Sequence, residues 1–352
     1  MKVLYLFNRV REGLVDKVKK GESHDNHFYG MLRLRQYGVE ADYIEIEQYL
    51  PKALCDFLRK RVLNIYFVHL PLFFKMLRYD AVFTSTAFGS QLLHALYPFK
   101  KPRWVMFDFS IMGLLGEEKT LRQRVFRWMV RRADGIVAIS RDEESRLQRR
   151  FPEMKERIRF IPLGSDLEFF KPRNSGEENK VFTVGFDPGR DYKTFFEACG
   201  GIDVSVVIAT KPYKVAKLKL PSNFSAREFS PVDIVREYDT AKVVVLPLDI
   251  RGGINEAMGC SSLVEAMAMG KPVVATRTPT MESYIENGVN GILVPPHDAS
   301  ALRSAVLSLL DDGERRKKMG LAAREFILKR CAADDVAREL ASFFKLIARS
   351  AR

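Results

Sequence analysis

Cysteine, histidine and tryptophan are scarce in this sequence, and their scarcity excludes several classes of protein. The 352 residues include four cysteines, five histidines and two tryptophans. The cysteines lie far apart with no CxxC spacing, so neither a disulfide framework nor a zinc motif is indicated. We therefore expect free thiols and a cytoplasmic location. The four are Cys55, Cys199, Cys260 and Cys331.

Long hydrophobic runs are also lacking. The longest, residues 62–77, contains Asn64, His69, Pro71 and Lys75, and it falls short of the ~20 apolar residues that span a bilayer. The apolar stretch at the amino terminus is short, contains arginines soon after its start and is followed by no small-residue cleavage site. It therefore favours a buried first strand over a signal peptide. We expect no transmembrane segment.

Acidic residues are too few to balance the basic ones, and the net charge is +13. Residues 1–165 hold 30 Lys/Arg and 19 Asp/Glu, which gives +11, whereas the remainder holds 27 and 25, which gives +2. A positive first half suggests an anionic partner surface, either phospholipid or nucleic acid, although many basic proteins merely have solvated basic faces.

Short β-branched or aliphatic runs alternate with helical patterns, which is typical of parallel sheets with crossover helices. The length favours two cores, and a polar run at residues 171–180 separates two such series. We predict an α/β fold of two Rossmann-like doubly wound domains facing across a cleft, at residues 1–165 and 166–333, with a final helix over 334–352 that packs back onto the first. Strands are expected at residues 3–7, 41–46, 81–84, 103–107, 135–139, 158–161, 182–185, 204–209, 243–246, 272–275 and 291–294.

Residues 259–265 read GCSSLVE, an unusual start for an otherwise apolar helix. Gly259 permits a tight turn, and the backbone amides of Ser261, Ser262 and Leu263 would point out of a helix end that carries partial positive charge. The stretch therefore predicts a phosphate site. The alternative is structural, because Ser262 and Glu265 also fit a capping box.

Several segments in order resemble glycosyltransferase family 4, whose fold is called GT-B. They are RRADGIVAIS at 131–140, RIRFIPLGSDLEFFKP at 157–172, TVGFDPGRDYKTFFEA at 183–198, VREYDTAKVVVLPLD at 235–249 and SSLVEAMAMGKPVVAT at 261–276. The resemblance covers most of residues 130–325, whereas residues 1–130 match in pattern only. It implies that the first domain binds an acceptor and the second binds a nucleotide-sugar.

The resemblance also implies roles for the residues around the helix start. Glu265 matches the second acid of the family's paired-Glu motif, which holds the donor ribose, and the amides of residues 261–263 would hold the diphosphate. The first acid, which contacts the donor sugar, is shifted by one position and would be Glu256, with Asn255 or the loop at 251–253 as alternatives. The implied donor is a UDP- or GDP-type nucleotide-sugar, with no metal and no other cofactor.

The family's basic pair after the first strand of the second domain is altered here, because Phe186 stands where an arginine is usual. Arg190 and Lys193 are the substitutes that we expect to stabilise the leaving diphosphate, since guanidinium and ammonium groups donate well to phosphate. The alternative is a solvated turn in which Asp187 and Asp191 pair with these bases.

Other expected site residues rest on weaker signals. Lys211 and Phe229 fall where the family lodges its nucleotide base. Asp108 stands beside Phe107, which replaces a family histidine, and we expect it either at the acceptor side of the site or as an ordinary strand-end turn residue. His24 and His27 would line the acceptor site, unless they are exposed helix-cap histidines.

Two stretches, residues 53–78 and 121–132, interleave basic and aromatic side chains. Such a pattern suits an interfacial helix on an anionic membrane, or else a helix with aromatics facing the core and bases facing water. No nucleic-acid module is recognised, so we expect no nucleic-acid partner. The resemblance implies a retaining glycosyltransferase acting on a hydroxyl acceptor, which we expect to be a lipid-linked or cell-envelope glycan at the inner membrane face. A noncatalytic nucleotide-sugar-binding protein is the alternative.

Overall fold

The computed structural model describes the chain except for residues 8–9, 46–47, 52, 56, 58–71, 86–87, 110, 118, 187–188, 252–256 and 350–352. The chain forms two compact units. The first contains Met1–Asp16, Phe28–Pro162 and Asp334–Arg352, and the second contains Lys17–His27 and Leu163–Ala333. The expected division at residue 165 lies close to Pro162, after which the chain passes from the first unit to the second. It did not anticipate that Lys17–His27 belongs to the second unit.

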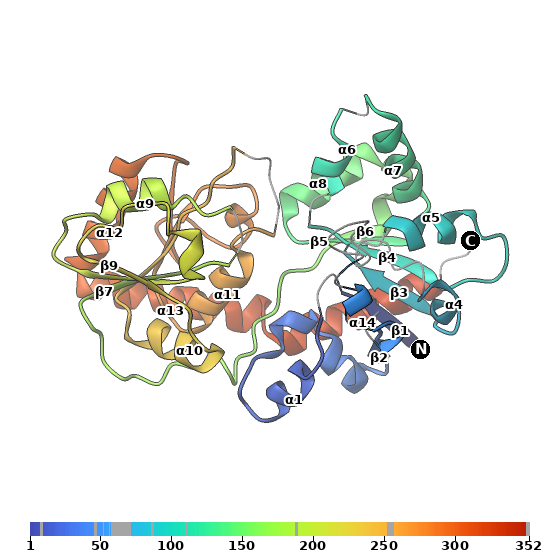
Figure 1. Cartoon of the computed structure of the whole chain (residues 1–352), viewed down its shortest axis with the longest axis horizontal. Helices are drawn as coiled ribbons and strands as arrows, with labels where there is room; N and C mark the ends of the chain where they lie inside the picture. Colours follow the sequence, from blue (N-terminus) through green and yellow to red (C-terminus); the bar gives the residue numbers. More distant parts are fainter. Residues whose placement is uncertain are drawn as a thin grey trace. The chain divides into compact units, whose positions relative to one another are not determined.

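The first unit is built on a six-stranded parallel sheet of order β2-β1-β3-β4-β5-β6 (Figure 1). Its central strands are buried along their whole length, as expected for hydrophobic runs covered on both faces. The strands are β1 (Lys2–Leu6), β2 (Glu40–Tyr43), β3 (Ala81–Thr84), β4 (Arg103–Phe107), β5 (Gly135–Ala138) and β6 (Ile158–Phe160).

Helices and short 3-10 turns connect these strands. They are α1 (Leu14–Lys19), η1 (Asp25–Phe28), η2 (Met31–Tyr37), α4 (Phe73–Met76), α5 (Phe88–Leu96), α6 (Ile111–Leu115), α7 (Leu121–Arg131), α8 (Arg141–Arg150) and η5 (Pro152–Arg157). In α7 the residues Phe126, Met129 and Val130 are buried while most arginines are not. This part of the basic-aromatic pattern therefore fits a helix with an ordinary core face.

The last helix, α14 (Ala333–Arg349), returns to the first unit. The ring of Phe344 lies 5.5 Å from that of Phe83 in β3 and 6.5 Å from that of Tyr5 in β1. At the start of β5, a β-carbon on Gly135 would lie 2.9 Å from the ring of Phe343, so the glycine lets the helix approach the sheet closely. The helix thus covers part of the first sheet.

The second unit contains another six-stranded parallel sheet, of order β12-β11-β10-β7-β8-β9. Its strands are β7 (Lys180–Val184), β8 (Ser205–Ala209), β9 (Phe224–Arg227), β10 (Val243–Leu246), β11 (Val273–Thr276) and β12 (Ile292–Val294). The edge strand β9 was not predicted, because only Phe224 is buried in it and its sequence shows no apolar run. The doubly wound prediction is otherwise confirmed for both sheets.

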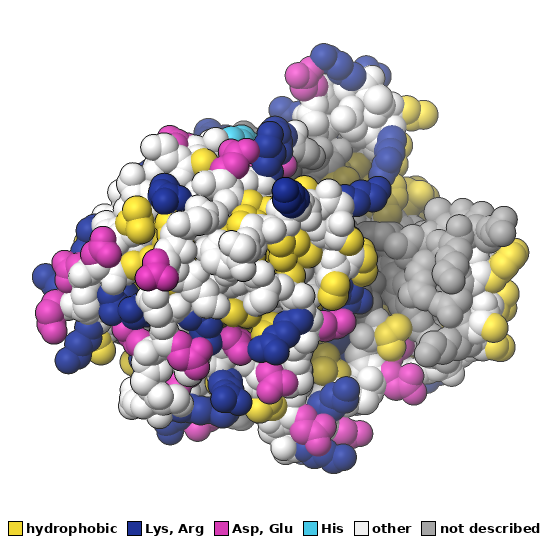
Figure 2. Space-filling view, turned by 60° about the vertical axis from the view of Figure 1, so that its left-hand side comes forward, with side chains coloured by type: hydrophobic (Ala, Val, Ile, Leu, Met, Phe, Trp, Pro, Cys, Tyr) yellow, Lys and Arg dark blue, Asp and Glu magenta, His cyan; other side chains and the backbone are white. Residues whose placement is uncertain are grey.

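Helices lie on both faces of this sheet, with α9 and α12 on one side and α10 on the other (Figure 1). They are α9 (Tyr192–Cys199), η6 (Pro212–Lys214), α10 (Pro231–Thr240), α11 (Cys260–Ala268), η7 (Met281–Ser283), α12 (Ala299–Leu310) and α13 (Gly313–Arg330). On the face shown in Figure 2, basic and acidic side chains are interspersed. Within the described ranges, no helix combines the length and the apolar character needed to cross a bilayer.

Candidate functional site

The loop after β7 places Arg190 at the carboxyl edge of the second sheet. Arg190 pairs with Leu248 in an isolated antiparallel bridge, and the next amide, that of Asp191, donates to the carbonyl of Pro247 at 3.0 Å. The Arg190 side chain lies over Gly185, where a β-carbon would overlap the guanidinium. This glycine therefore makes room for a guanidinium that is 8% exposed.

The first turn of α11 faces this guanidinium. Gly259 precedes the helix with a left-handed φ of 79°, which favours glycine. Nη2 of Arg190 lies 3.3 Å from the hydroxyl oxygen of Ser262, and this hydroxyl donates to the carbonyl of Val184 at 3.3 Å. An arginine from one loop and a helix start from another are thereby brought together, as an anion site requires.

The helix start differs in two respects from the expectation. The amide of Leu263 donates to the carbonyl of Gly259 at 2.9 Å, so it is not available to a diphosphate, whereas no acceptor for the amides of Ser261 and Ser262 is found in the described part of the chain. The capping box is not formed, because the N-cap is Gly259, which has no side chain to accept a hydrogen bond. Ser262 and Glu265 instead make contacts outside the helix.

Glu265 lies one turn further along α11 and is 7% exposed. The hydroxyl of Tyr238, from α10, donates to its Oε2 at 3.3 Å. Burial raises the pKa of Glu265 to about 8, although the Tyr238 hydroxyl, the side chain of Asn26 and the charge of Arg190 all act in the opposite direction. Such a carboxyl is mostly protonated at neutral pH and can both donate to and accept from a ribose hydroxyl.

Asn26 and Tyr238 were not expected at this site. Asn26 comes from the amino-terminal segment Lys17–His27, and its Oδ1 accepts from the amide of Asp166 at 2.8 Å. Tyr238 also donates to the carbonyl of Ser262 at 3.2 Å. Tyr238 stands in the family-like segment at 235–249, but its sequence position alone indicates no role. Asn26 stands in none of these segments, and only the folding of Lys17–His27 onto the second unit reveals it.

The structure separates the two expected bases. Arg190 is buried, but Lys193 projects from the first turn of α9 with 77% of its side chain exposed and lies 4.0 Å from Glu197. Lys193 therefore fits the solvated alternative better than a place beside Arg190. Asp191 caps α9 by accepting from the amide of Thr194.

A charged network that the sequence did not suggest lies next to Arg190. Nδ1 of His297 lies 2.7 Å from Oδ2 of Asp191, and its Nε2 lies 3.6 Å from Asp249. Arg251 pairs with Asp249 at 2.7 Å, and its hydrogen bonds hold the pKa of Asp249 at about 2. This network joins the loop after β12 to the loops after β7 and β10.

The other two residues predicted for the donor site in the second unit come shortly after the carboxyl ends of β8 and β9. Lys211 is exposed and precedes η6. Phe229 is half-buried, with its ring 6.5 Å from that of Phe182 and the guanidinium of Arg227 4.4 Å above it. Both lie at the edge where Arg190 is placed, so a role in base binding stays a prediction.

The two histidines lie in the second unit, not in the first, where the sequence had placed them. His24 is buried, with its ring 4.9 Å from that of Phe170 and 4.4 Å from that of His27. Burial, together with the charge of His27, holds the pKa of His24 well below its ordinary value of 6.5. His24 is therefore a neutral packing residue, whereas His27 is exposed.

In the first unit, Asp108 follows β4 and is fully buried. Its Oδ1 accepts from the amide of Ile111 at 2.6 Å, at the start of α6, which favours the turn alternative. Phe107, at the position of the family histidine, packs 5.3 Å from Phe83 and 5.0 Å from Tyr29 between ring centroids. An aromatic cluster thus replaces the histidine.

Glu256, Asn255 and the neighbouring glycines lie outside the described residues, so the role of the shifted acid stays a prediction. Among the residues that the structure does describe, no group of three His, Cys, Asp or Glu side chains is placed to hold a metal ion. All four cysteines are free and buried.

Two parallel doubly wound sheets, one with an arginine and a helix start at its carboxyl edge, define a nucleotide-binding type of α/β protein. A family model described as glycosyl transferases group 1 matches residues 166–326, and one described as glycosyltransferase family 4 matches residues 29–169. Together they span both sheets. The chain belongs to glycosyltransferase family 4, with the GT-B fold.

Known proteins agree with this assignment. A D-inositol 3-phosphate glycosyltransferase of Corynebacterium diphtheriae is 26% identical over 59% of this chain and 55% of its own length, so only about half of that relative is matched. Sucrose-phosphate synthase from Thermosynechococcus elongatus has a TM-score of 0.72 at 19% identity and covers 99% of both chains. HepE of Anabaena, solved with UDP-glucose, has a TM-score of 0.67 at 15% identity and covers 98% of this chain and all of its own.

Proposed function

We propose that this protein transfers a hexosyl group from a UDP- or GDP-type nucleotide-sugar to a hydroxyl acceptor, with retention of anomeric configuration. The observation that carries the proposal is the pairing of the buried Arg190 guanidinium with Ser262 at the start of α11. The amides of Ser261 and Ser262 lie on the same helix turn, so a guanidinium and two backbone amides converge at one end of the second sheet.

Departure of a nucleoside diphosphate is the step that this arrangement would favour. The bond between the anomeric carbon and the β-phosphate oxygen breaks, a bond to the acceptor oxygen forms, and the proton of the acceptor hydroxyl is taken up by the departing diphosphate. Negative charge grows on the departing diphosphate, and preorganised donors in a partly buried site stabilise such charge without needing to reorient. Arg190 and the two amides would supply those donors without a metal ion.

Glu265 would hold the ribose of the donor. Its carboxyl is buried beside Tyr238, and a carboxyl with a pKa near 8 can donate one hydrogen bond and accept others. Lys211 and Phe229 would then contact the base at the ends of β8 and β9. Glu256 is the residue that we assign to the donor sugar.

For the acceptor we propose a lipid-linked or cell-envelope glycan at the cytoplasmic face of a membrane, with the protein bound peripherally. Basic residues outnumber acidic ones mainly in the first 165 residues, and an anionic leaflet attracts such segments. A structure of similar fold supports this choice: WaaG, a glycosyltransferase involved in lipopolysaccharide biosynthesis, has a TM-score of 0.65 at 15% identity.

The proposal is tested in two stages. Thermal unfolding is followed with UDP-, GDP- and ADP-sugars, because a ligand that binds only the folded state raises the midpoint in proportion to its occupancy. The donor with the largest shift is then supplied in labelled form with a membrane lipid extract. Transfer of label to lipid supports the proposal. Donor binding without hydrolysis or transfer in any extract would identify a noncatalytic nucleotide-sugar-binding protein instead. The observation that favours this alternative is the aromatic cluster around Phe107, which stands where the family has a histidine.

A further inference from the structure

A basic pocket lies at the amino edge of the first sheet. It has a volume of about 680 Å³ and is lined by residues that come directly before β1, β3 and β4 and by the last turns of α14. All strands of this sheet are parallel, so the pocket lies at the edge opposite Asp108 and Phe107. It is therefore separate from the carboxyl edge where ligands of open α/β sheets bind.

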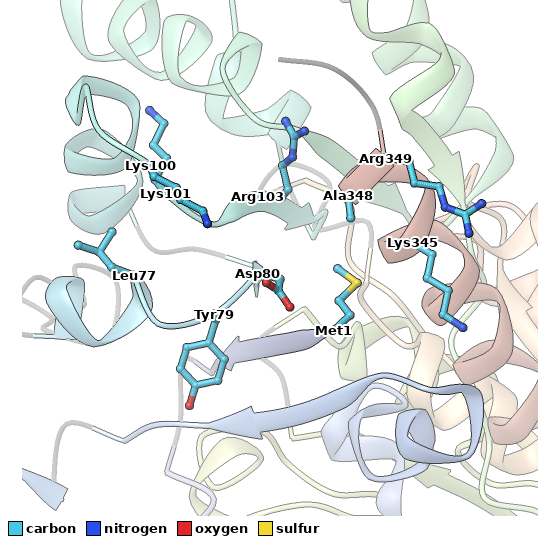
Figure 3. A pocket seen from close by; sticks show the side chains of 10 residues that line it. All are labelled: Met1, Leu77, Tyr79, Asp80, Lys100, Lys101, Arg103, Lys345, Ala348 and Arg349. Carbon is cyan, nitrogen blue, oxygen red and sulfur yellow. The ribbon is translucent and has the colours of Figure 1, made fainter.

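Five cationic side chains and one carboxylate line the pocket. In Figure 3, Asp80 and Met1 lie between Lys100 and Lys101 on one side and the two cations of α14 on the other. The complete set of charged lining residues is Asp80, Lys100, Lys101, Arg103, Lys345 and Arg349. The pocket thus has a clear excess of positive charge.

The cations of the pocket make different kinds of contact. Nζ of Lys101 donates to the carbonyl of Tyr97 at 3.0 Å, and Nζ of Lys345 donates to the carbonyl of Tyr37 at 2.6 Å. The carbonyl of Tyr37 holds the Lys345 ammonium group in place without neutralising its charge. Arg103 does pair with a carboxylate, Asp134, at 2.8 Å. Lys100 has no ion pair within the described part of the chain and is exposed.

Exposed apolar side chains lie next to the pocket. Leu93 and Leu96 are 40% and 61% exposed on α5, three residues apart and so on one face of the helix. Phe99, directly before Lys100, is 69% exposed, and Phe74 of α4 is 76% exposed.

The two exposed phenylalanines are linked through the partly buried Tyr97 and the buried Phe73. The ring of Phe99 lies 5.4 Å from that of Tyr97, Tyr97 lies 5.5 Å from Phe73, and Phe73 lies 5.8 Å from Phe74. We call Phe74, Leu93, Leu96 and Phe99 the apolar edge. It continues into the basic pocket at Leu77 and Lys100, both of which line that pocket.

We propose that this surface docks on an anionic phospholipid bilayer, with a lipid phosphate in the basic pocket and the apolar edge in the interfacial region. The pairing of cations with exposed aromatic and leucine side chains matches the two components of such an interface, phosphate and acyl boundary. A solvated basic face would not need the four exposed apolar side chains, and a soluble anion would not contact them. The inference rests on the peripheral membrane binding in the proposed function and names the surface that makes it.

The test uses the full chain and vesicles of phosphatidylcholine alone or with phosphatidylglycerol. One variant removes two charges, Lys100→Ser with Arg349→Ser, and a second removes apolar area, Leu96→Ser with Phe99→Ser. The matched control, Lys317→Ser with Lys318→Ser, removes the same charge from exposed positions of α13 in the second unit. Thermal midpoints and circular dichroism show that each variant is folded.

We expect the wild type and the control to sediment with anionic vesicles and not with neutral ones. The charge variant should bind anionic vesicles at least about tenfold more weakly, since each cation near an anionic leaflet contributes about fivefold. The apolar variant should lose binding at raised salt, where the charge attraction is screened. Equal binding by all four proteins, or equal loss in the charge variant and the control, would overturn the assignment.

Two further measurements separate the inference from its alternatives. In the first, the thermal midpoints of the wild type and the charge variant are measured with glycerol phosphate. If glycerol phosphate raises only the wild-type midpoint while both proteins bind vesicles equally, the pocket binds a soluble phosphate and the membrane assignment is wrong. The nucleotide-sugar thermal shift is measured on the same variants and should be unchanged. If the nucleotide-sugar shift remains in a variant that no longer binds vesicles, the donor function is unaffected. Failure of the membrane inference can therefore be told apart from failure of the proposed function.

Discussion

Nη2 of Arg190 lies 3.3 Å from the hydroxyl of Ser262, and this contact joins the loop after β7 to the first turn of α11. The two residues are 72 positions apart in the sequence. Their meeting depends on Gly185, over which the guanidinium lies, and on the bridge between Arg190 and Leu248. The donor site is thus assembled from the carboxyl ends of neighbouring strands, β7 and β10.

Replacing Gly185 with alanine should displace Arg190 without removing its charge. A β-carbon at this position would overlap the guanidinium, so the side chain must leave its place beside Ser262. Loss of a charge-assisted hydrogen bond costs about 1.5–3 kcal/mol, so we expect Gly185→Ala to weaken donor binding by about tenfold to a hundredfold. Calorimetry with the best donor measures this.

The control is Gly313→Ala at the start of α13, where a β-carbon would lie 3.6 Å from the nearest atom, in ordinary contact. This variant should bind the donor as the wild type does. An unchanged affinity in Gly185→Ala would show that the position of Arg190 over this glycine is not needed for binding.

Glu265 should make the stability fall as the pH rises. Its pKa is about 8 in the folded protein against an ordinary value of 4.5, so between these values the folded state holds a proton that the unfolded state has lost. The stabilisation from this proton is complete below pH 4.5 and is lost as the pH rises through about 8. Relative to Glu265→Gln, the wild type should lose about 1.4 kcal/mol per pH unit in this window.

Urea unfolding of both proteins between pH 5 and pH 8 measures that difference. A constant difference in the free energy of unfolding across the window would mean that Glu265 is ionised in the folded protein, contrary to its burial beside Tyr238.

His24 should have the opposite effect at lower pH. Burial holds its pKa well below 6.5, so the unfolded chain binds a proton below pH 6.5 that the folded protein excludes. The stability that neutral His24 contributes is present above pH 6.5 and is lost as the pH falls toward its folded pKa. We expect His24→Gln, which cannot titrate, to lose less stability than the wild type between pH 6.5 and pH 5, as measured by urea unfolding. Parallel curves for the wild type and His24→Gln would show that His24 is protonated in the fold.

The strands other than β9 and the helix start at Gly259 were predictable because local composition determines them. Runs such as residues 81–84 and 243–246 are buried throughout, and the left-handed turn at Gly259 favours glycine. Arg190, Ser262 and Glu265 were found through their place in family-like segments. Their closeness in space follows from parallel strands whose carboxyl ends meet at one edge of a sheet.

Other features depend on contacts between distant segments and leave no local signal. Segment Lys17–His27 joins the second unit through Asn26 and His24, more than a hundred residues from their partners near Asp166. Lys193 looked equivalent to Arg190 in sequence, but its position on α9 directs it to solvent. The direction of a side chain at a helix start depends on where the helix begins, which single-sequence patterns fix only to within a few residues.

The central claim is that Arg190 stabilises the departing diphosphate, and turnover of the identified donor in Arg190→Ala and Lys193→Ala tests it most directly. Both variants remove one positive charge from the same loop-helix segment, but only Arg190 contacts the start of α11. We predict that Arg190→Ala lowers kcat for transfer or donor hydrolysis by about a hundredfold or more, and that Lys193→Ala stays near the wild-type rate. Wild-type turnover in Arg190→Ala, or an equal loss in both variants, would contradict the account.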